Sequence, residues 1–178
     1  SDTTGFTIHA EDIITIEADP VSTPALPVNY HWGLRCDMAD ATQIVYAAAN
    51  DGDVSTTADR FMQLVGHTNT MASAENATQV GANEVVVNGI WVWLSADPGT
   101  SPDAYSYTVR DDAVDTGCTV TITADSVTGE KTNCTDIIRH PSLLAIEISP
   151  LNTPLTATMN TAIGVAFTYQ PRKKVLIE

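Results

Sequence analysis

The sequence predicts an all-β fold with its strands arranged as a sandwich or a barrel. Apolar and polar residues alternate over many short runs, and a period of two is typical of half-buried strands. Thr and Val, which are branched at Cβ and suit a pleated surface, are abundant. Turn signals such as ADPGTSPD and DSVTGEK separate the runs. We expect about nine to eleven strands at the spacing of a sandwich or a barrel.

Five runs carry the alternation most clearly, and each places its apolar residues on one face of a strand. Polar residues, Gly or Ala occupy most of the opposite positions, so the apolar set is the expected core. The set consists of Val28, Tyr30, Trp32 and Leu34; Tyr105, Tyr107 and Val109; Cys118, Val120 and Ile122; Ile146 and Ile148; and Ile163, Val165, Phe167 and Tyr169.

The chain has 178 residues, and a single domain is expected at this length. We divide it into an N-terminal ribbon and crossover (residues 1–25), a sandwich (residues 26–169) and a C-terminal tail (residues 170–178). The three prolines of ADPVSTPALP favour an extended crossover. Only DVSTTADRFMQLVG could contain a helical turn.

The most hydrophobic run is EVVVNGIWVWLSADPG. Its apolar phase slips at Asn88 and Gly89, which predicts a bulge or a turn at that point. Trp91 and Trp93 fall on one face of the strand, and the other face is apolar too, so both faces should be covered. Because burial is the default for aromatic side chains, we expect both tryptophans in the core, with a subunit contact as the alternative.

Acidic residues outnumber basic residues by 22 to 8, which gives a net charge of −14. Such a surface stays soluble in salt and repels nucleic acid and anionic membranes, so we expect no nucleic-acid partner. The chain has no run of apolar residues long enough for a bilayer, so no membrane insertion is expected. The N-terminus lacks the basic start and apolar core of a signal peptide; a signal removed earlier and a removed initiator Met both stay open.

Cys118 and Cys134 lie in two runs that read as strands joined by ADSVTGEK. If this hairpin is symmetric about Ser126, the cysteines face each other across a ladder, about 4.5–5.5 Å apart at Cβ, where a disulfide can close. A zinc site needs about four ligands and usually contains a close Cys-x-x-Cys pair, and a thioredoxin-like redox pair needs the same motif, which is absent. We therefore predict a disulfide, with free thiols as the alternative. Cys36 is expected to be a buried small hydrophobe or a bridge to another chain.

The C-terminal half resembles a known family. GIWVWLSADPGTSPDAYSYTVRDD reads as strand, turn and strand, CTVTITADSVTGEKTNCTD as a stapled hairpin, and HPSLLAIEISPLNTPLTATMNTAIGVAFTY as the closing strands. Together, over about residues 84–169, they are similar to the small jelly-roll domains of tumour-necrosis-factor-like type in phage virion proteins and bacterial surface proteins. The resemblance implies a two-sheet antiparallel jelly-roll sandwich with an eight-strand core, preceded by the N-terminal ribbon and followed by a C-terminal extension. It also implies frequent trimers, structural or adhesive roles and no catalytic residues.

The sequence contains no motif for catalysis. His-Glu-x-x-His, Gly-x-Ser-x-Gly and a phosphate-binding Gly-rich loop are all absent, so we expect neither an enzyme nor a cofactor. The loops NDGD and RDDAVD offer oxygen ligands of the kind that Ca²⁺ prefers, through Asp51, Asp53, Asp111 and Asp112. Neither loop has the spacing of an EF-hand, so we expect solvated acidic loops rather than a metal site.

The C-terminal tail joins a basic cluster to an apolar end, made of Arg172, Lys173 and Lys174 followed by Val175, Leu176 and Ile177. An apolar strand that ends in solvent is a liability, so we expect it to pair with another chain, the alternative being a frayed end. These six residues, together with Trp91 and Trp93, are the expected subunit contacts.

The function we expect is that of a structural protein in a virion or extracellular surface assembly, of capsid-decoration, fibre or coat type, acting through oligomerisation. Its expected partners are copies of itself and a major capsid or surface-layer protein. Two alternatives use the same fold, which hosts many functions. One is a carbohydrate-binding or adhesion module with exposed aromatics such as Tyr30, Trp32 or Tyr105. The other is a subunit of an extracellular filament joined by strand donation.

Overall fold

Eleven β-strands and one 3₁₀ turn form the part of the chain that the computed structural model describes, namely residues 42–82, 84–155 and 159–169. All of these residues belong to one of the two units into which the chain divides, Asp37–Glu178. The other unit, Ser1–Cys36, lies outside the described residues, and so do the strand expected near Trp32 and the tail from residue 170 onward.

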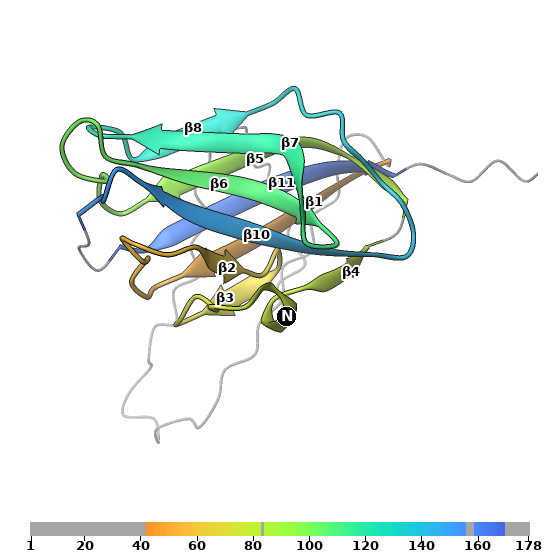
Figure 1. Cartoon of the computed structure of the whole chain (residues 1–178). Coiled ribbons are helices and arrows are strands. Elements are labelled where there is room, and N and C mark those ends of the chain that lie inside the picture. The colour runs from red at the N-terminus through yellow and green to blue at the C-terminus, as the bar shows by residue number, and fades with distance from the viewer. Residues whose placement is uncertain (1–41, 83, 156–158, 170–178) are drawn as a thin grey trace, which may run out of the picture. The chain divides into compact units, whose positions relative to one another are not determined.

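The strands form two sheets that pack face to face (Figure 1). The six-stranded sheet has the order β3–β1–β11–β5–β8, with β9 also paired to β5. Its strands are β1 (Gln43–Asn50), β3 (Gly66–Thr68), β5 (Val85–Leu94), β8 (Thr128–Lys131), β9 (Ile137–Ile138) and β11 (Thr161–Tyr169). The five-stranded sheet has the order β2–β10–β6–β7, with β4 also paired to β10. Its strands are β2 (Arg60–Met62), β4 (Val80–Ala82), β6 (Ala104–Asp111), β7 (Val114–Thr123) and β10 (Ser142–Leu151).

In the long antiparallel ladders, strands from the start of the described chain pair with strands from its end, and strands from its middle pair with one another. β1 pairs with β11, β2 and β4 pair with β10, β5 pairs with β8 and β9, and β6 pairs with β7. The predicted all-β, two-sheet sandwich is confirmed, whereas its jelly-roll topology stays a prediction. The expectation of purely antiparallel sheets is wrong at one edge, where β3 pairs with β1 in parallel. The chain visits the other sheet as β2 between these two strands, and such a crossover lets it return in the same direction.

The core lies between the two sheets and is lined by the alternating residues that the sequence predicted. The described members of that set that are buried there are Tyr105, Tyr107, Val109, Cys118, Val120, Ile122, Ile146, Ile148, Ile163, Val165 and Phe167. Tyr169 differs and is 44% exposed, because β11 ends there at the rim of the sandwich. At the same end Tyr46 packs against Phe167, with ring centroids 5.3 Å apart.

The irregularity predicted at Asn88 and Gly89 is a β-bulge in β5. Ala166 pairs with Gly89 but Phe167 pairs with Val87, which leaves Asn88 as the extra residue. The bulge is held on both sides: the Asn88 side chain accepts a hydrogen bond from the Thr168 hydroxyl (2.6 Å), and its carbonyl accepts one from the Cys134 N–H (3.1 Å). The bulge resets the phase of β5, so residues 90, 92 and 94 turn into the core.

The helical turn considered for DVSTTADRFMQLVG does not form; the segment contains β2 instead. Phe61 pairs with Glu147 of β10 on one side and with Ala72 on the other, so its backbone groups are used by sheet pairing. A 3₁₀ turn, η1, forms further along the chain at Glu75–Ala77. Within the three described ranges, no helix has the length and apolar character needed to cross a membrane.

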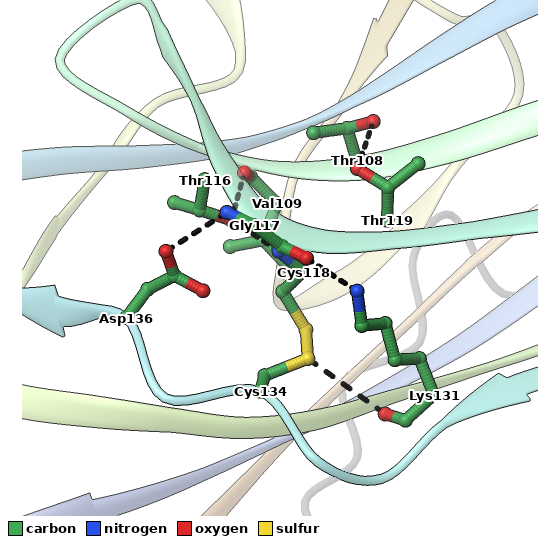
Figure 2. Close-up of a disulfide and its surroundings, with 9 residues drawn as sticks. All are labelled: Thr108, Val109, Thr116, Gly117, Cys118, Thr119, Lys131, Cys134 and Asp136. Atoms are coloured by element: carbon green, nitrogen blue, oxygen red, sulfur yellow. Dashed lines mark hydrogen bonds between the residues drawn. A yellow bond between two sulfur atoms is a disulfide. The ribbon is translucent and has the colours of Figure 1, made fainter.

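Cys118 and Cys134 form a disulfide, as predicted, with their Cα atoms 5.2 Å apart (Figure 2). The predicted hairpin around it is wrong, however, because β7 and β8 belong to different sheets. β8 pairs with β5 in the six-stranded sheet. It also packs closely against β7 of the other sheet, since a Cβ at Gly129 would come within 2.9 Å of the Val120 and Ile122 side chains. The bridge therefore joins the five-stranded sheet to the loop after β8 and links the two layers.

The backbone beside the disulfide on the β7 edge is occupied by side chains (Figure 2). The Gly117 N–H donates to the Asp136 carboxylate (2.8 Å), and the Gly117 carbonyl accepts from Lys131 Nζ (2.6 Å). The Cys118 N–H donates to the Thr116 hydroxyl (3.1 Å). Because these groups are already bonded, this part of the β7 edge does not offer a free ladder to another strand.

Replacing Cys118 and Cys134 together by Ser should lower the free energy of unfolding by about 3 kcal/mol, as expected for closing a loop of this size. Urea unfolding of the variant and of the wild-type chain measures the difference, with Cys36→Ser as the control. Non-reducing peptide mapping should also recover the two cysteines as one cross-linked fragment. Two freely alkylated thiols in the native protein would contradict the prediction.

Candidate interaction surface

The outer face of the six-stranded sheet carries three aligned rows of small and apolar residues from β1, β11 and β5. Alternate residues of these strands are buried in the core, so the residues between them face outward. The ladders align the outward residues as Val45–Ala166–Gly89, Ala47–Gly164–Trp91 and Ala49–Ala162–Trp93. We call these nine residues the small-residue face; Gly89 within it is buried beneath the Trp91 ring and the Lys131 carbonyl.

The central strand of this face, β11, presents only Ala and Gly and forms a low strip. A Cβ placed on Gly164 would have no atom within 4 Å, so the space above the strip is open among the described residues. Beside the strip, Trp91 and Trp93 of β5 form an aromatic ridge, in which Trp91 is 37% exposed and Trp93 is half-buried. On the other side, Val45 of β1 is 45% exposed. The face is therefore a ridge next to a strip of minimal height.

The Trp91 ring is held at both ends. Its indole N–H donates to the Glu130 carboxylate of β8 at 3.1 Å. Its six-membered ring lies over Gly89, since a Cβ on that glycine would come within 3.0 Å of Trp91 Cη2. The expectation that Trp91 and Trp93 belong to the core is wrong. After the bulge, Ile90, Val92 and Leu94 face the core, and the two tryptophans lie on the opposite face of the strand. The ridge is thus a fixed aromatic surface rather than a buried one.

The small-residue face carries no charge in a chain whose net charge is −14. Glu130 lies at one border, where it pairs with Trp91 in the ladder. At the other border His67 of β3 pairs with Ala49, and its Nε2 lies 3.7 Å from an Asp51 oxygen. The face is therefore a neutral, largely apolar patch on a strongly acidic molecule, which is a feature typical of interaction surfaces.

A second cluster surrounds Arg110 on the outer face of the five-stranded sheet. Its Nε lies 3.2 Å from Glu75 of η1, and one terminal nitrogen contacts both Glu147 of β10 and Asp115 of β7. The other terminal nitrogen donates to a backbone carbonyl in the β6–β7 turn, and the guanidinium carbon lies 6.0 Å from the centre of the Phe61 ring. One cation thus ties four elements together, which indicates a structural clamp.

The carboxylates of this cluster outnumber its cation. Burial raises the pKa of Glu147; Arg110 opposes the rise, whereas Asp115 and Asp59 add to it. Proton binding by Glu147 is therefore easier in the folded chain than in the unfolded one. The Arg110 and Glu147 side chains are 15% and 14% exposed, so this is a partly dehydrated ion pair rather than a fully solvated one.

The four aspartates considered for Ca²⁺ lie in two separate loops. Asp51 and Asp53 follow β1, and the Asp51 backbone N–H donates to the Thr68 carbonyl (3.3 Å). Asp111 ends β6, and Asp112 begins the turn to β7, where its carboxylate accepts a hydrogen bond from the Leu143 N–H at 2.9 Å. Among the residues that the structure describes, no group of three or more His, Cys, Asp or Glu side chains is placed to hold a metal ion.

The aromatic candidates for sugar binding are not brought together. Tyr105 is fully buried, so the expectation that it is an exposed binding residue is wrong. Tyr30, Trp32 and the predicted contact residues of the tail, 172–177, lie outside the described residues. An apolar hollow at one end of the sandwich has a volume of ≈ 70 Å³, well below the roughly 300–1,000 Å³ of ligand pockets. The described geometry therefore favours an exposed surface over a pocket.

Sequence reasoning missed the small residues that make up most of the face. The signal is present in QIVYAAAN and AIGVAFTY, where Ala or Gly occupies most of the positions between the core residues. The adjacency of these two runs was not predictable, because they are the first and last described strands of the sandwich. Arg110 was missed for the same reason, since its partners Glu75 and Glu147 come from two distant segments.

Arg110→Met should lower the free energy of unfolding by about 3 kcal/mol, because it leaves a partly buried cluster of carboxylates without its cation. Chemical unfolding measures the loss. Arg139→Met, which removes the same charge from an exposed residue, is the matched control and should change stability by less than about 0.5 kcal/mol. Equal stability of the two variants would contradict the clamp.

Glu147→Gln should alter the pH dependence of stability. Because the pKa of Glu147 is raised in the folded state, protonation of this group stabilises the fold as pH falls, and the contribution is lost as pH rises through the folded pKa. The wild-type chain should therefore gain stability relative to Glu147→Gln between pH 7 and pH about 4.5. Unfolding free energies of both proteins across this range measure the effect, with Asp53→Asn as the exposed control. A constant or opposite difference would contradict it.

Neither protein-family models nor curated protein sequences identify a relative of this chain. The resemblance to jelly-roll domains of tumour-necrosis-factor-like type therefore stays a prediction from the residues, and function has to be argued from the two surfaces described above.

Proposed function

We propose that this chain is a structural protein of a virion or extracellular surface assembly, of capsid-decoration, fibre or coat type, and that it acts through self-association. The observation that carries the proposal is the small-residue face, which has no charge and, among the described residues, no atom within 4 Å of a Cβ on Gly164, on a chain with a net charge of −14. A face of this kind loses little hydration energy of polar groups when another surface covers it, and its apolar area contributes about 25 cal/mol per Å² buried.

A second copy of the chain is the partner that the charge distribution favours. Two acidic copies repel each other wherever carboxylates meet, so they can approach closely only through a surface without charge. The small-residue face meets this condition, with Glu130 at its border. Basic partners would instead be drawn to the acidic surfaces elsewhere. A major capsid or surface-layer protein is a further partner that would use the remaining surface.

The extent of the face indicates how strong one such contact can be. Three strands about 4.8 Å apart and about five residues long cover roughly 240 Å² in projection. A stable interface takes about 800 Å² from each partner. One contact through this face alone is therefore weak, and the proposed assembly depends on repetition of the contact in a larger particle.

Two further observations support the proposed fold type and location. A jelly roll is a long antiparallel hairpin whose successive strand pairs alternate between two sheets. The strand pairs of this chain follow that order, which favours the jelly roll of tumour-necrosis-factor-like type. The disulfide between Cys118 and Cys134 favours an oxidising environment, such as the virion surface or the extracellular space. The alternative of a filament joined by strand donation depends on the tail, residues 170–178, which lies outside the described residues.

Carbohydrate binding is the second candidate function, and one observation favours it. Trp91 is exposed and its indole is held by Glu130, so a fixed aromatic ring lies beside a carboxylate that can accept hydrogen bonds from hydroxyl groups. Quenching or enhancement of tryptophan fluorescence by soluble oligosaccharides, lost in Trp91→Ala, would favour this candidate over self-association.

Light scattering of the wild-type chain at micromolar concentration should give a multiple of 19.0 kDa. Ala47→Glu places a carboxylate in the middle row of the small-residue face, on β1, and should shift the protein to the monomer, because association would then bury this charge in a strongly acidic pair of molecules. Thr121→Glu adds the same charge to an exposed strand residue of the other sheet and should leave the mass unchanged. A wild-type chain that is monomeric at all concentrations would remove the proposal.

A further inference from the structure

We infer that two copies associate by placing the Trp91–Trp93 ridge of each on the Ala162–Gly164–Ala166 strip of the other. This inference rests on the proposed self-association and adds which residues meet. The ridge and the strip lie on the same face, on the neighbouring strands β5 and β11. A surface that carries a projection next to a matching low strip can be complementary to a copy of itself.

The geometry of the sheet determines the symmetry of such a contact. A two-fold axis parallel to the strands, lying between β5 and β11 in the plane of the interface, carries each ridge over the strip of the other copy. Positions along the strand are unchanged by this rotation. Because Trp91 pairs with Gly164 and Trp93 pairs with Ala162 in the ladder, each tryptophan faces the same small residue of the other copy.

Gly164 is the residue that points most directly to a close approach from outside. Glycine in the interior of a strand weakens the strand, and it often marks a place where a ligand or another backbone approaches too closely for a side chain to fit. Nothing in the described fold requires glycine here: a Cβ would have no atom within 4 Å, and the only described glycines with positive φ are Gly66 and Gly99. Gly89 and Gly129 differ, because a Cβ at either would come within 3.0 Å of neighbouring atoms.

The ridge has the properties of a residue cluster that dominates an interface. Trp91 is held by Glu130 and by its contact over Gly89, so little side-chain freedom is lost when another surface covers it. Large aromatic side chains that fit into a space between small residues contribute most to binding in protein interfaces. The Trp91–Gly164 contact is therefore the expected centre of the interface.

Two variants of the full chain test this contact. Gly164→Val fills the strip without a clash inside the monomer, and Val favours a strand, so the variant should unfold at the same temperature as the wild-type chain or higher. It should nevertheless weaken self-association at least tenfold, as measured by sedimentation equilibrium. Trp91→Ala removes the ridge and should weaken association by a similar factor. Gly81→Val is the matched control, because a Cβ at Gly81 also has no atom within 4 Å but lies on β4 of the other sheet.

Mixing the two variants separates this contact from a general effect on the face. A mixed pair contains one native contact of Trp91 with Gly164 and one contact in which the added valine meets the space left by the removed indole. The mixture should associate more tightly than either variant alone. The inference would be overturned if Gly164→Val associates as tightly as the wild-type chain. It would also be overturned if the mixture associates no more tightly than either variant alone. If Ala47→Glu still dissociates the protein in that case, the proposed self-association stands; a monomeric wild-type chain would overturn both.

Discussion

The ladder between β11 and β5, with its single bulge, is the interaction on which the rest of the structure depends. Asn88 is the extra residue, and it shifts the phase of β5 so that Ile90 faces the core while Trp91 faces outward. Without the bulge, the residues on either side of Asn88 could not both place apolar side chains inside. The same shift that completes the core therefore creates the aromatic ridge on the outer surface.

The two outer faces of the sandwich are used differently. On the five-stranded sheet, Arg110 ties the 3₁₀ turn and three strands together through partly buried ion pairs. On the six-stranded sheet, a Cβ on Gly164 would have no described atom within 4 Å. Between the layers, the Cys118–Cys134 bridge links the sheets at one side and gives a rigid body on which both surfaces are fixed. A rigid support of this kind limits the entropy lost when a surface binds a partner.

The proposed self-association is consistent with the acidity of the chain and with its neutral face. A net charge of −14 keeps copies apart in most orientations, because their carboxylates repel. One uncharged face allows close approach in a restricted set of orientations, so repulsion elsewhere adds specificity to an interface whose attraction is mainly apolar.

The sequence by itself determined the strands, the core alternation, the bulge at Asn88 and the partnership of Cys118 with Cys134, because each is encoded by residues close in the chain or by residue type. Only the tertiary structure decided that the disulfide joins two sheets and that Trp91 faces outward. It also decided that Gly164 lies beside Trp91 and that Arg110 meets Glu75 and its other carboxylates. Alternation shows that a strand has two faces, but which face is covered depends on the register and order of strands that are distant in sequence.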